Sequence, residues 1–158
     1  MNIFFSSLDP VACARFLDNK RAVKMPLETA QMLSTAVRST GLEVGYKATH
    51  ANHPSNVWAR ASKQNFLWLC EHGLALCAEY TRRYGKTHKS EAIIKDLIQH
   101  ADRFESVGLT TLPNCAANKE QGLDFKSEPC IHTAYRKYLS ARFLNDKKPA
   151  VCNLYATR

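Results

Sequence analysis

The chain has 158 residues and a formal net charge of +8, with 45% hydrophobic and 23% charged residues. This length suits one domain with its own core, so we expect residues 1–158 to form a single domain. No apolar run approaches the roughly 18 residues that a membrane-spanning helix needs, and the N-terminus lacks the features of a signal peptide. These properties exclude membrane-spanning and secreted classes, and we expect a cytoplasmic protein.

The positive charge is concentrated in the first part of the chain. Residues 1–90 contain 12 Lys/Arg against 6 Asp/Glu, whereas residues 91–158 contain 10 against 8. A basic surface attracts polyanions because binding releases counterions from them. We therefore predict a polyanionic partner such as nucleic acid and place its binding face mainly in residues 1–90.

The N-terminal residues 1–7 (MNIFFSS) fit a short strand or an extended arm. Asp9 and Pro10 then mark a helix start, because aspartate caps free backbone N–H groups and proline at the first helical position loses no hydrogen bond. The sequence predicts a helix over residues 11–19.

Two further helices follow. Residues 20–41 carry apolar side chains at intervals of three and four, which predicts an amphipathic helix with Pro26 near its first turn and Gly41 as its stop. After a turn, Pro54 can open a short helix over residues 57–62.

The longest helical pattern covers residues 63–84, with Ser62 as its cap and a glycine directly after it. A fifth helix is predicted over residues 90–104, followed by a loop that extends to residue 126. Such a length is unusual for a loop in a compact domain and is typical either of a loop that covers a site or of a mobile one.

A last helix is predicted over residues 130–144, and an irregular tail over residues 146–158. We find no sustained strand alternation. The sequence therefore predicts an all-α fold of about five to six helices around a long central helix at residues 63–84.

Lys24, Glu28 and Gln31 share one face of the predicted helix because they are spaced at i, i+4 and i+7. A carboxylate beside an amine is suited to general acid/base chemistry. An exposed Lys-Glu pair that contributes a few tenths of a kcal/mol is the alternative interpretation.

The turn KATHANHPSNVWAR (47–60) holds two histidines three residues apart. Zinc needs more ligands than His50 and His53 provide, so we predict no metal. The turn fits either phosphate contacts, with backbone N–H groups of the following helix, or ordinary packing. Trp58 is more typical of a core residue than of a stacking platform.

The segment YTRRYGKTHK (80–89) interleaves cationic and aromatic side chains beyond what helix capping requires, which favours phosphate contact. No glycine-rich phosphate loop is present, and we predict no cofactor. The predicted DNA-binding residues are Arg21, Gln31, Lys47, His50, His53, Trp58, Arg60, Arg83, Lys86, His88 and Lys89.

Three segments, LDNKRAVKMPLETAQMLSTA, GYKATHANHPSNVWARASKQNFLWL and LCAEYTRRYGKTHKS, resemble small proteins encoded by tailed bacteriophages. This resemblance covers about residues 10–90 and implies a protein that acts in the host cytoplasm. The chain also distantly resembles the pyrimidine-dimer DNA glycosylases of the endonuclease V type, which are small, basic and all-α.

The second resemblance implies a glycosylase that also cleaves abasic sites. Such enzymes attack the sugar C1′ with an N-terminal α-amine, form a Schiff base and cleave the strand by elimination, with help from a glutamate. The family glutamate would align near Val23, more than a turn from Glu28. Asn2 is bulky enough to keep the initiator methionine, so the amine would be that of Met1, with Lys24 as the alternative.

Two other functions stay open at this level. Related phage proteins imply an enzyme that transfers an amino acid to a modified thymine. A phage protein that only binds nucleic acid, a nucleotide or a host protein is the non-enzymatic alternative.

Overall fold

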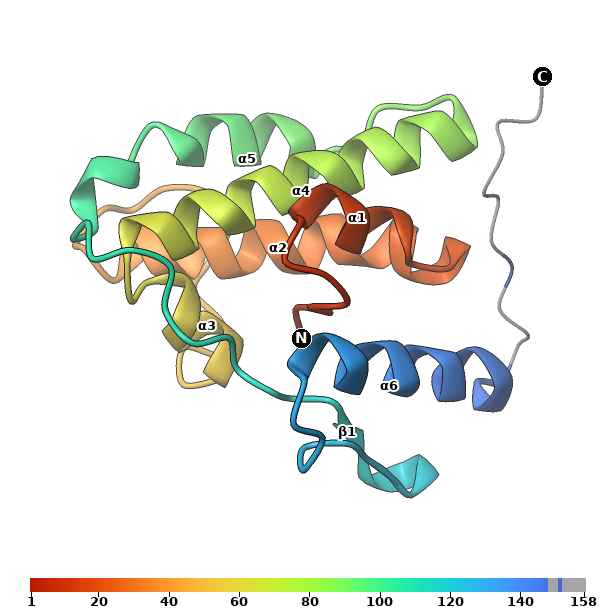
Figure 1. Cartoon of the computed structure of the whole chain (residues 1–158). Coiled ribbons are helices and arrows are strands. Elements are labelled where there is room, and N and C mark those ends of the chain that lie inside the picture. Colours follow the sequence, from red (N-terminus) through yellow and green to blue (C-terminus); the bar gives the residue numbers. More distant parts are fainter. Residues whose placement is uncertain (148–150, 152–158) are drawn as a thin grey trace.

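Helix α4 (Lys63–Tyr84) lies at the centre of the fold, in a computed structural model that describes residues 1–147 and 151. Ser62 caps its start and Gly85 ends it in the left-handed conformation, as predicted. Four helices pack against it: α1 (Pro10–Arg15), α2 (Asn19–Arg38), α3 (Pro54–Ala59) and α5 (Ser90–Ile98). Figure 1 shows α4 crossing in front of α2, with α5 alongside. The predicted central helix is confirmed.

The first two helices differ from prediction in their bounds. Asp9 caps α1 as expected, but the helix predicted over residues 11–19 ends early because Asp18 starts a new one. The Asp18 carboxylate accepts the Arg21 backbone N–H at 3.3 Å. Pro26 lies inside α2, about two turns after Asn19, so its predicted place near the first turn is wrong.

A glycine in α4 lets three helices approach closely. A Cβ atom on Gly73 would lie 2.9 Å from the Thr29 Cγ2 atom of α2 and 2.9 Å from the Ile94 Cδ1 atom of α5. Real Cβ atoms do not make contacts this short, so the absence of a side chain is required here. This contact fixes α2, which carries the predicted Lys24 and Glu28.

The N-terminal residues 1–7 form an extended arm without strand pairing. The arm runs between α1 and α6 (Ile131–Asn145) in Figure 1. Phe5 is fully buried and lies 5.1 Å from the ring centroid of Trp58, while Phe4 stacks on Tyr138 at 6.2 Å. The aromatic contacts join α6 to the remaining helices through the arm.

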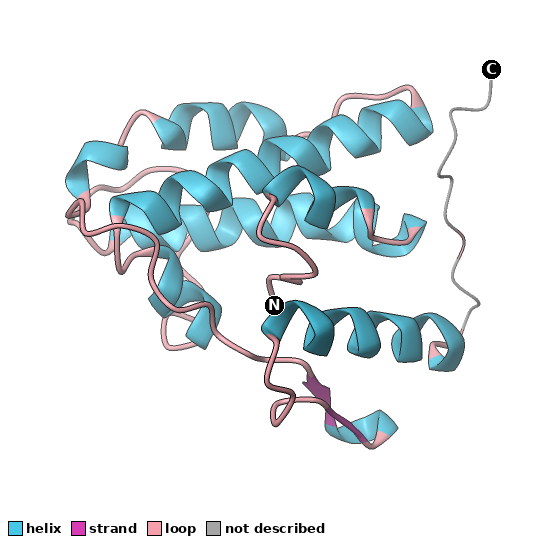
Figure 2. Cartoon of the chain, in the orientation of Figure 1, coloured by secondary structure: helices cyan, strands magenta, loops and turns pink. Residues whose placement is uncertain are grey.

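The segment between α5 and α6 contains short elements that the sequence did not predict. They are η1 (Ala101–Arg103), β1 (Ala117–Asn118), η2 (Lys119–Gln121) and β2 (Leu123–Asp124), and the strands lie below α6 in Figure 2. The two strands pair antiparallel, with Ala117 opposite Asp124. The fold is otherwise helical, and the predicted all-α class is confirmed.

Boundaries elsewhere shift by a few residues. α3 starts three residues before its prediction, α5 ends at Ile98 instead of residue 104, and α6 runs to Asn145. The predicted irregular tail at 146–158 falls outside the described residues except at 146, 147 and 151. Within the described chain, every helix is too short or too polar to cross a membrane.

Candidate active site

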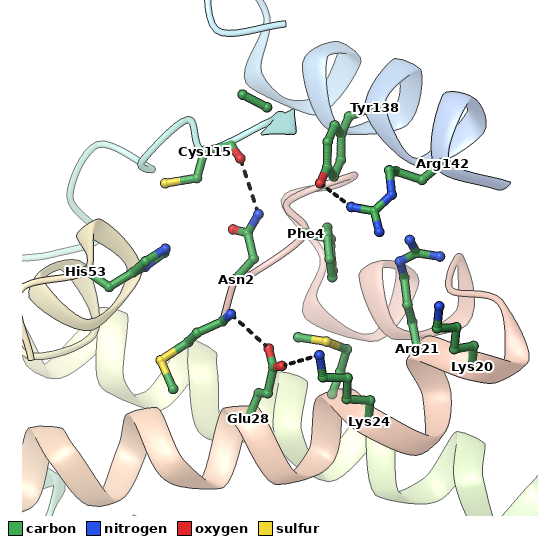
Figure 3. Close-up of a pocket in the computed structure, with 13 residues that line it drawn as sticks. Asn2, Phe4, Lys20, Arg21, Lys24, Glu28, His53, Cys115, Tyr138 and Arg142 are labelled. Carbon is green, nitrogen blue, oxygen red and sulfur yellow. Dashed lines mark hydrogen bonds and ion pairs between the residues drawn. The ribbon is translucent and has the colours of Figure 1, made fainter. Parts of the chain in front are cut away.

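A cavity of about 300 Å³ opens where the N-terminal arm meets α2 and α6. Its walls come from the arm, one face of α2, the residue that precedes α3, the loop before β1, and α6. Figure 3 shows the side chains that line it. The cavity thus combines segments that are far apart in the sequence.

The chain's own α-amine faces a carboxylate in this cavity. The Met1 nitrogen lies 3.6 Å from Glu28 Oε2, and Lys24 Nζ lies 3.1 Å from Glu28 Oε1. Figure 3 shows Glu28 between the two amines. The exposed side-chain fractions are 4% for Met1, 12% for Glu28 and 66% for Lys24. The three residues predicted to be catalytic therefore lie together, with only Lys24 largely in solvent.

Hydrogen bonds hold the residues around the amine in place. The Asn2 side chain donates to the Cys115 carbonyl at 3.3 Å and accepts from the Tyr135 hydroxyl at 3.2 Å. The Asn56 amide donates to the Met1 sulfur at 3.2 Å. These contacts of Asn2 could not be predicted from the sequence, because its partners are more than 100 residues away. Met1 is therefore an integrated part of this wall.

His53 lies on the far side of the amine from the arginines in Figure 3. Burial lowers the pKa of His53, and the nearby N-terminal amine and His50 lower it further, whereas Glu28 opposes the shift. Its Nδ1 accepts the Ser55 backbone N–H at 3.2 Å, which leaves the proton of the neutral ring on Nε2. His53 is therefore a neutral hydrogen-bond donor at pH 7.

Two arginines form the opposite wall, held by one carboxylate. Asp146 accepts from Arg142 Nε at 2.8 Å and from Arg21 at 2.9 Å, and Gln121 adds a third hydrogen bond. Burial raises the pKa of Asp146, but the hydrogen bonds from Arg142, Gln121 and Arg21 outweigh it and lower the pKa to about 2. The Arg142 guanidinium also donates to the Tyr138 hydroxyl at 2.7 Å.

The lining carries more positive than negative charge, since Lys20, Arg21, Lys24, Arg142 and the N-terminal amine surround a single lining carboxylate. Asp146 and Asp18 lie behind the arginines and orient them. Such an arrangement suits a substrate with phosphate groups. A proton acceptor, a buried amine and an anion-binding wall are thus within one cavity.

A family model described as pyrimidine dimer DNA glycosylase matches residues 1–92. The chain belongs to this family. The distant resemblance noted in the sequence is therefore confirmed, and with it the family's link to DNA. Comparisons with curated proteins and with solved structures gave no match.

The match to the glycosylase family includes Met1, Lys24, Glu28 and His53 but ends before α6. Cys115, Tyr138 and Arg142 complete the cavity from outside the matched region. No local pattern marks Arg142 as a site residue, because only the folded chain brings it beside Arg21.

The carboxylate that faces the amine is Glu28, although the sequence alignment with glycosylases placed the family glutamate near Val23. Val23 is 44% exposed and lines a different hollow. One reason is the register of α2: residues 24 and 28 share a face toward the arm, and residue 23 is turned away from it.

The predicted DNA-binding residues separate into five groups. Arg21 and His53 line the cavity, and Lys86, His88 and Lys89 line a groove on the other side of Lys24. Lys47, His50 and Arg60 belong to the turn around α3, where His50 has a positive φ of 48° and Arg60 donates to the Ala51 carbonyl. Gln31 is half-buried one turn after Glu28.

The remaining two, Trp58 and Arg83, are interior residues. Trp58 is 4% exposed and its indole N–H donates to the Thr110 carbonyl. The Arg83 side chain is completely buried, where it binds Glu79 at 3.1 Å and the Leu17 carbonyl at 2.8 Å. Neither can reach a phosphate in this arrangement, so we assign both a structural role in place of the predicted DNA contact.

Metal ligands are not clustered in the described part of the chain: no group of three or more His, Cys, Asp or Glu residues is placed to hold an ion. His50 and His53, the pair considered for a metal in the sequence, serve the turn before α3 instead. His50 pairs with the Thr49 hydroxyl at 2.7 Å, and His53 caps α3.

Proposed function

We propose that this protein is a DNA glycosylase with abasic-site lyase activity, in which the Met1 α-amine is the nucleophile and Glu28 is the acid/base group. The observation that carries the proposal is the distance of 3.6 Å between the Met1 nitrogen and Glu28 Oε2, within a cavity lined by cations. Membership of the glycosylase family supports DNA as the substrate.

Met1 is the better nucleophile of the two amines beside Glu28. Amines attack carbon only as the free base, and α-amines generally lose their proton near pH 8, whereas lysine side chains do so only near about pH 10. Lys24 is also 66% exposed and therefore hydrated, whereas the Met1 side chain is 4% exposed and held by hydrogen bonds around it. A fixed, enclosed amine can be aligned with a sugar carbon.

The chemistry needs no electron donor or acceptor. The free Met1 amine attacks the deoxyribose C1′, the bond from C1′ to the base breaks, and the base leaves with a proton. Opening of the sugar ring gives an iminium between Met1 and C1′. Glu28 then removes a proton from C2′, the 3′-phosphate leaves, and water hydrolyses the imine to regenerate the amine.

Other cavity residues have supporting roles in this scheme. His53 Nε2–H is suited to donate a hydrogen bond to the departing base, since the ring is neutral at pH 7. Arg21 and Arg142 face the space where phosphates on either side of the sugar would lie. The nucleotide must leave the duplex stack to enter a cavity of about 300 Å³, which favours damaged sites that unstack easily.

Borohydride trapping tests the proposal. The protein is incubated with an oligonucleotide that carries an abasic site, and separately with ultraviolet-irradiated DNA, and sodium borohydride reduces any Schiff base to a stable adduct. We expect adducts with both substrates, and peptide mapping should locate them on Met1. Absence of an adduct with both substrates would rule out the Schiff-base mechanism, and an adduct on Lys24 would reassign the nucleophile.

A further inference from the structure

A second hollow lies on the other side of Lys24 from the cavity. It has a volume of about 630 Å³ and is formed by α2, Tyr46, the end of α4 and residues 86–90. We call it the lysine groove. Lys24 lines both the groove and the cavity, so the two hollows are neighbours.

The floor of the lysine groove is apolar and aromatic. Val23 and Leu27, one turn apart on α2, are 44% and 39% exposed and together present an apolar surface to the groove. Tyr80 borders them, and its ring meets the edge of His88 at 4.9 Å. His88 Nε2 lies 3.2 Å from the Val23 carbonyl, so residues 86–90 are attached to α2 and the groove keeps its shape.

The rim of the groove is cationic. Lys24, Lys86 and Lys89 are all exposed. None of the groove-lining residues that the structure describes is acidic. Lys24 pairs with Glu28 in the cavity, whereas no ion pair joins Lys86 or Lys89 to another described residue. Lysines around an apolar floor complement a ligand that has both an anionic group and a flat apolar face.

We propose that the lysine groove binds an unpaired nucleotide of the substrate strand, next to the nucleotide in the cavity, so that the protein prefers single-stranded or locally opened DNA. The inference rests on the proposed function and specifies its substrate class. The base would lie on Val23, Leu27 and Tyr80, and its phosphates would bind the lysines.

The apolar floor is what favours an unpaired nucleotide over a duplex. In a duplex both faces of each base are covered by neighbouring bases, and the outside offers phosphates, sugars and base edges. Lysines alone can bind the phosphates of such a backbone, and the exposed Val23 and Leu27 would add nothing to the affinity for a duplex. An unstacked base, in contrast, has a free apolar face that aromatic and aliphatic side chains can cover.

Binding is measured by fluorescence anisotropy with a labelled oligothymidylate of about 10 nucleotides. Its central residue is a tetrahydrofuran abasic analogue, which has no leaving base and no C1′ aldehyde and cannot form a Schiff base. The same strand annealed to its complement is the duplex probe. We expect the single strand to bind about tenfold more tightly than the duplex.

Two variants test the rim and the floor separately. Lys86→Gln with Lys89→Gln should reduce the slope of log affinity against log salt by about 1.4, because each phosphate contact to a single strand contributes about 0.7. Leu27→Gln should weaken single-strand binding about fivefold and leave the salt slope unchanged. Lys63→Gln with Lys95→Gln is the matched control, since it removes the same charge from a half-buried and an exposed position outside the groove.

Several results would overturn the inference: tighter binding of the duplex, an equal change of slope in the control, or unchanged binding in both groove variants. Displacement of the probe by polyglutamate, with loss of polyglutamate binding in the lysine variant, would assign the groove to an acidic protein instead. The probe cannot react, so the binding assay and the trapping assay are independent. If the native protein shows no preference for the single strand but is still trapped by borohydride, only this inference fails. Intact groove binding without trapping removes only the proposed chemistry.

Discussion

One added residue at the N-terminus would test the proposed nucleophile most directly. A protein that begins Gly-Met, released from a cleavable tag, keeps every side chain of the native chain but moves the α-amine. Consecutive Cα atoms are about 3.8 Å apart, and the native amine lies 3.6 Å from Glu28 Oε2. The extension therefore moves the α-amine by about as much as its native distance from Glu28.

We expect this extension to reduce both borohydride trapping and strand cleavage by about a hundredfold or more, because a misplacement of about 1 Å can already have that effect on a reacting group. The added glycine would also crowd the wall in which the Met1 sulfur contacts Asn56. The amide that replaces the α-amine is not nucleophilic, so no partial activity should come from Met1 itself.

The assay compares three proteins on one abasic-site oligonucleotide: the native chain, the extended chain, and Lys24→Gln with its native N-terminus. Rates of adduct formation and of cleavage are read from denaturing gels. We expect Lys24→Gln to retain trapping. An extended protein that reacts as fast as the native one would refute the role of the α-amine, and loss of trapping in Lys24→Gln alone would identify the lysine.

Three further variants probe the acid/base group and the network around the site. Glu28→Gln should slow strand cleavage by about 10² to 10⁴-fold while Schiff-base trapping persists, as measured on abasic-site oligonucleotides. Asp146 is stabilising in its charged form because its folded pKa of about 2 lies below the ordinary value; this stabilisation is complete above about pH 4 and disappears as the pH falls through about 2. Asp146→Asn should therefore lower the melting temperature at neutral pH and have little effect near pH 2. Glu79→Gln should reduce the free energy of unfolding in urea by about 3 kcal/mol, because it leaves the buried Arg83 without its counter-charge.

Each of these variants has a result that contradicts its reasoning. Glu71→Gln, on the exposed side of α4, is the control for Glu28→Gln and should cleave at the native rate. Equal melting temperatures of native protein and Asp146→Asn at every pH would show that the arginine wall does not depend on this carboxylate. A urea midpoint of Glu79→Gln equal to that of the native protein would mean that water replaces the carboxylate.

Helix ends were predictable where a single capping residue determines them through its neighbouring backbone groups. Asp9, Ser62 and Gly85 act through their own side chain or backbone on adjacent N–H and C=O groups, and the structure places all three as predicted. The start of α2 was predicted to within one residue, but its cap was missed because Asp18 lay inside the helix predicted over residues 11–19.

The candidate site was predictable only as far as one helix extends. Lys24 and Glu28 are neighbours by helical spacing, so their pairing follows from local geometry. Their position beside Met1 depends on the aromatic packing of the N-terminal arm against α6, which no spacing reveals. The role of Arg142 could not be predicted from the sequence, since its place at the cavity depends on the packing of α6 and on its hydrogen bond to Asp146.

The hydrogen bond between Asn2 and Tyr135 spans 133 positions of the chain, which has a consequence for synthesis on the ribosome. Asn2 is made long before α6, the helix that anchors it. Helices α1 to α5 can pack on one another before then. The nascent chain therefore carries the proposed nucleophile on an unanchored arm, and we expect the proposed activity only after α6 has been made and binds the arm.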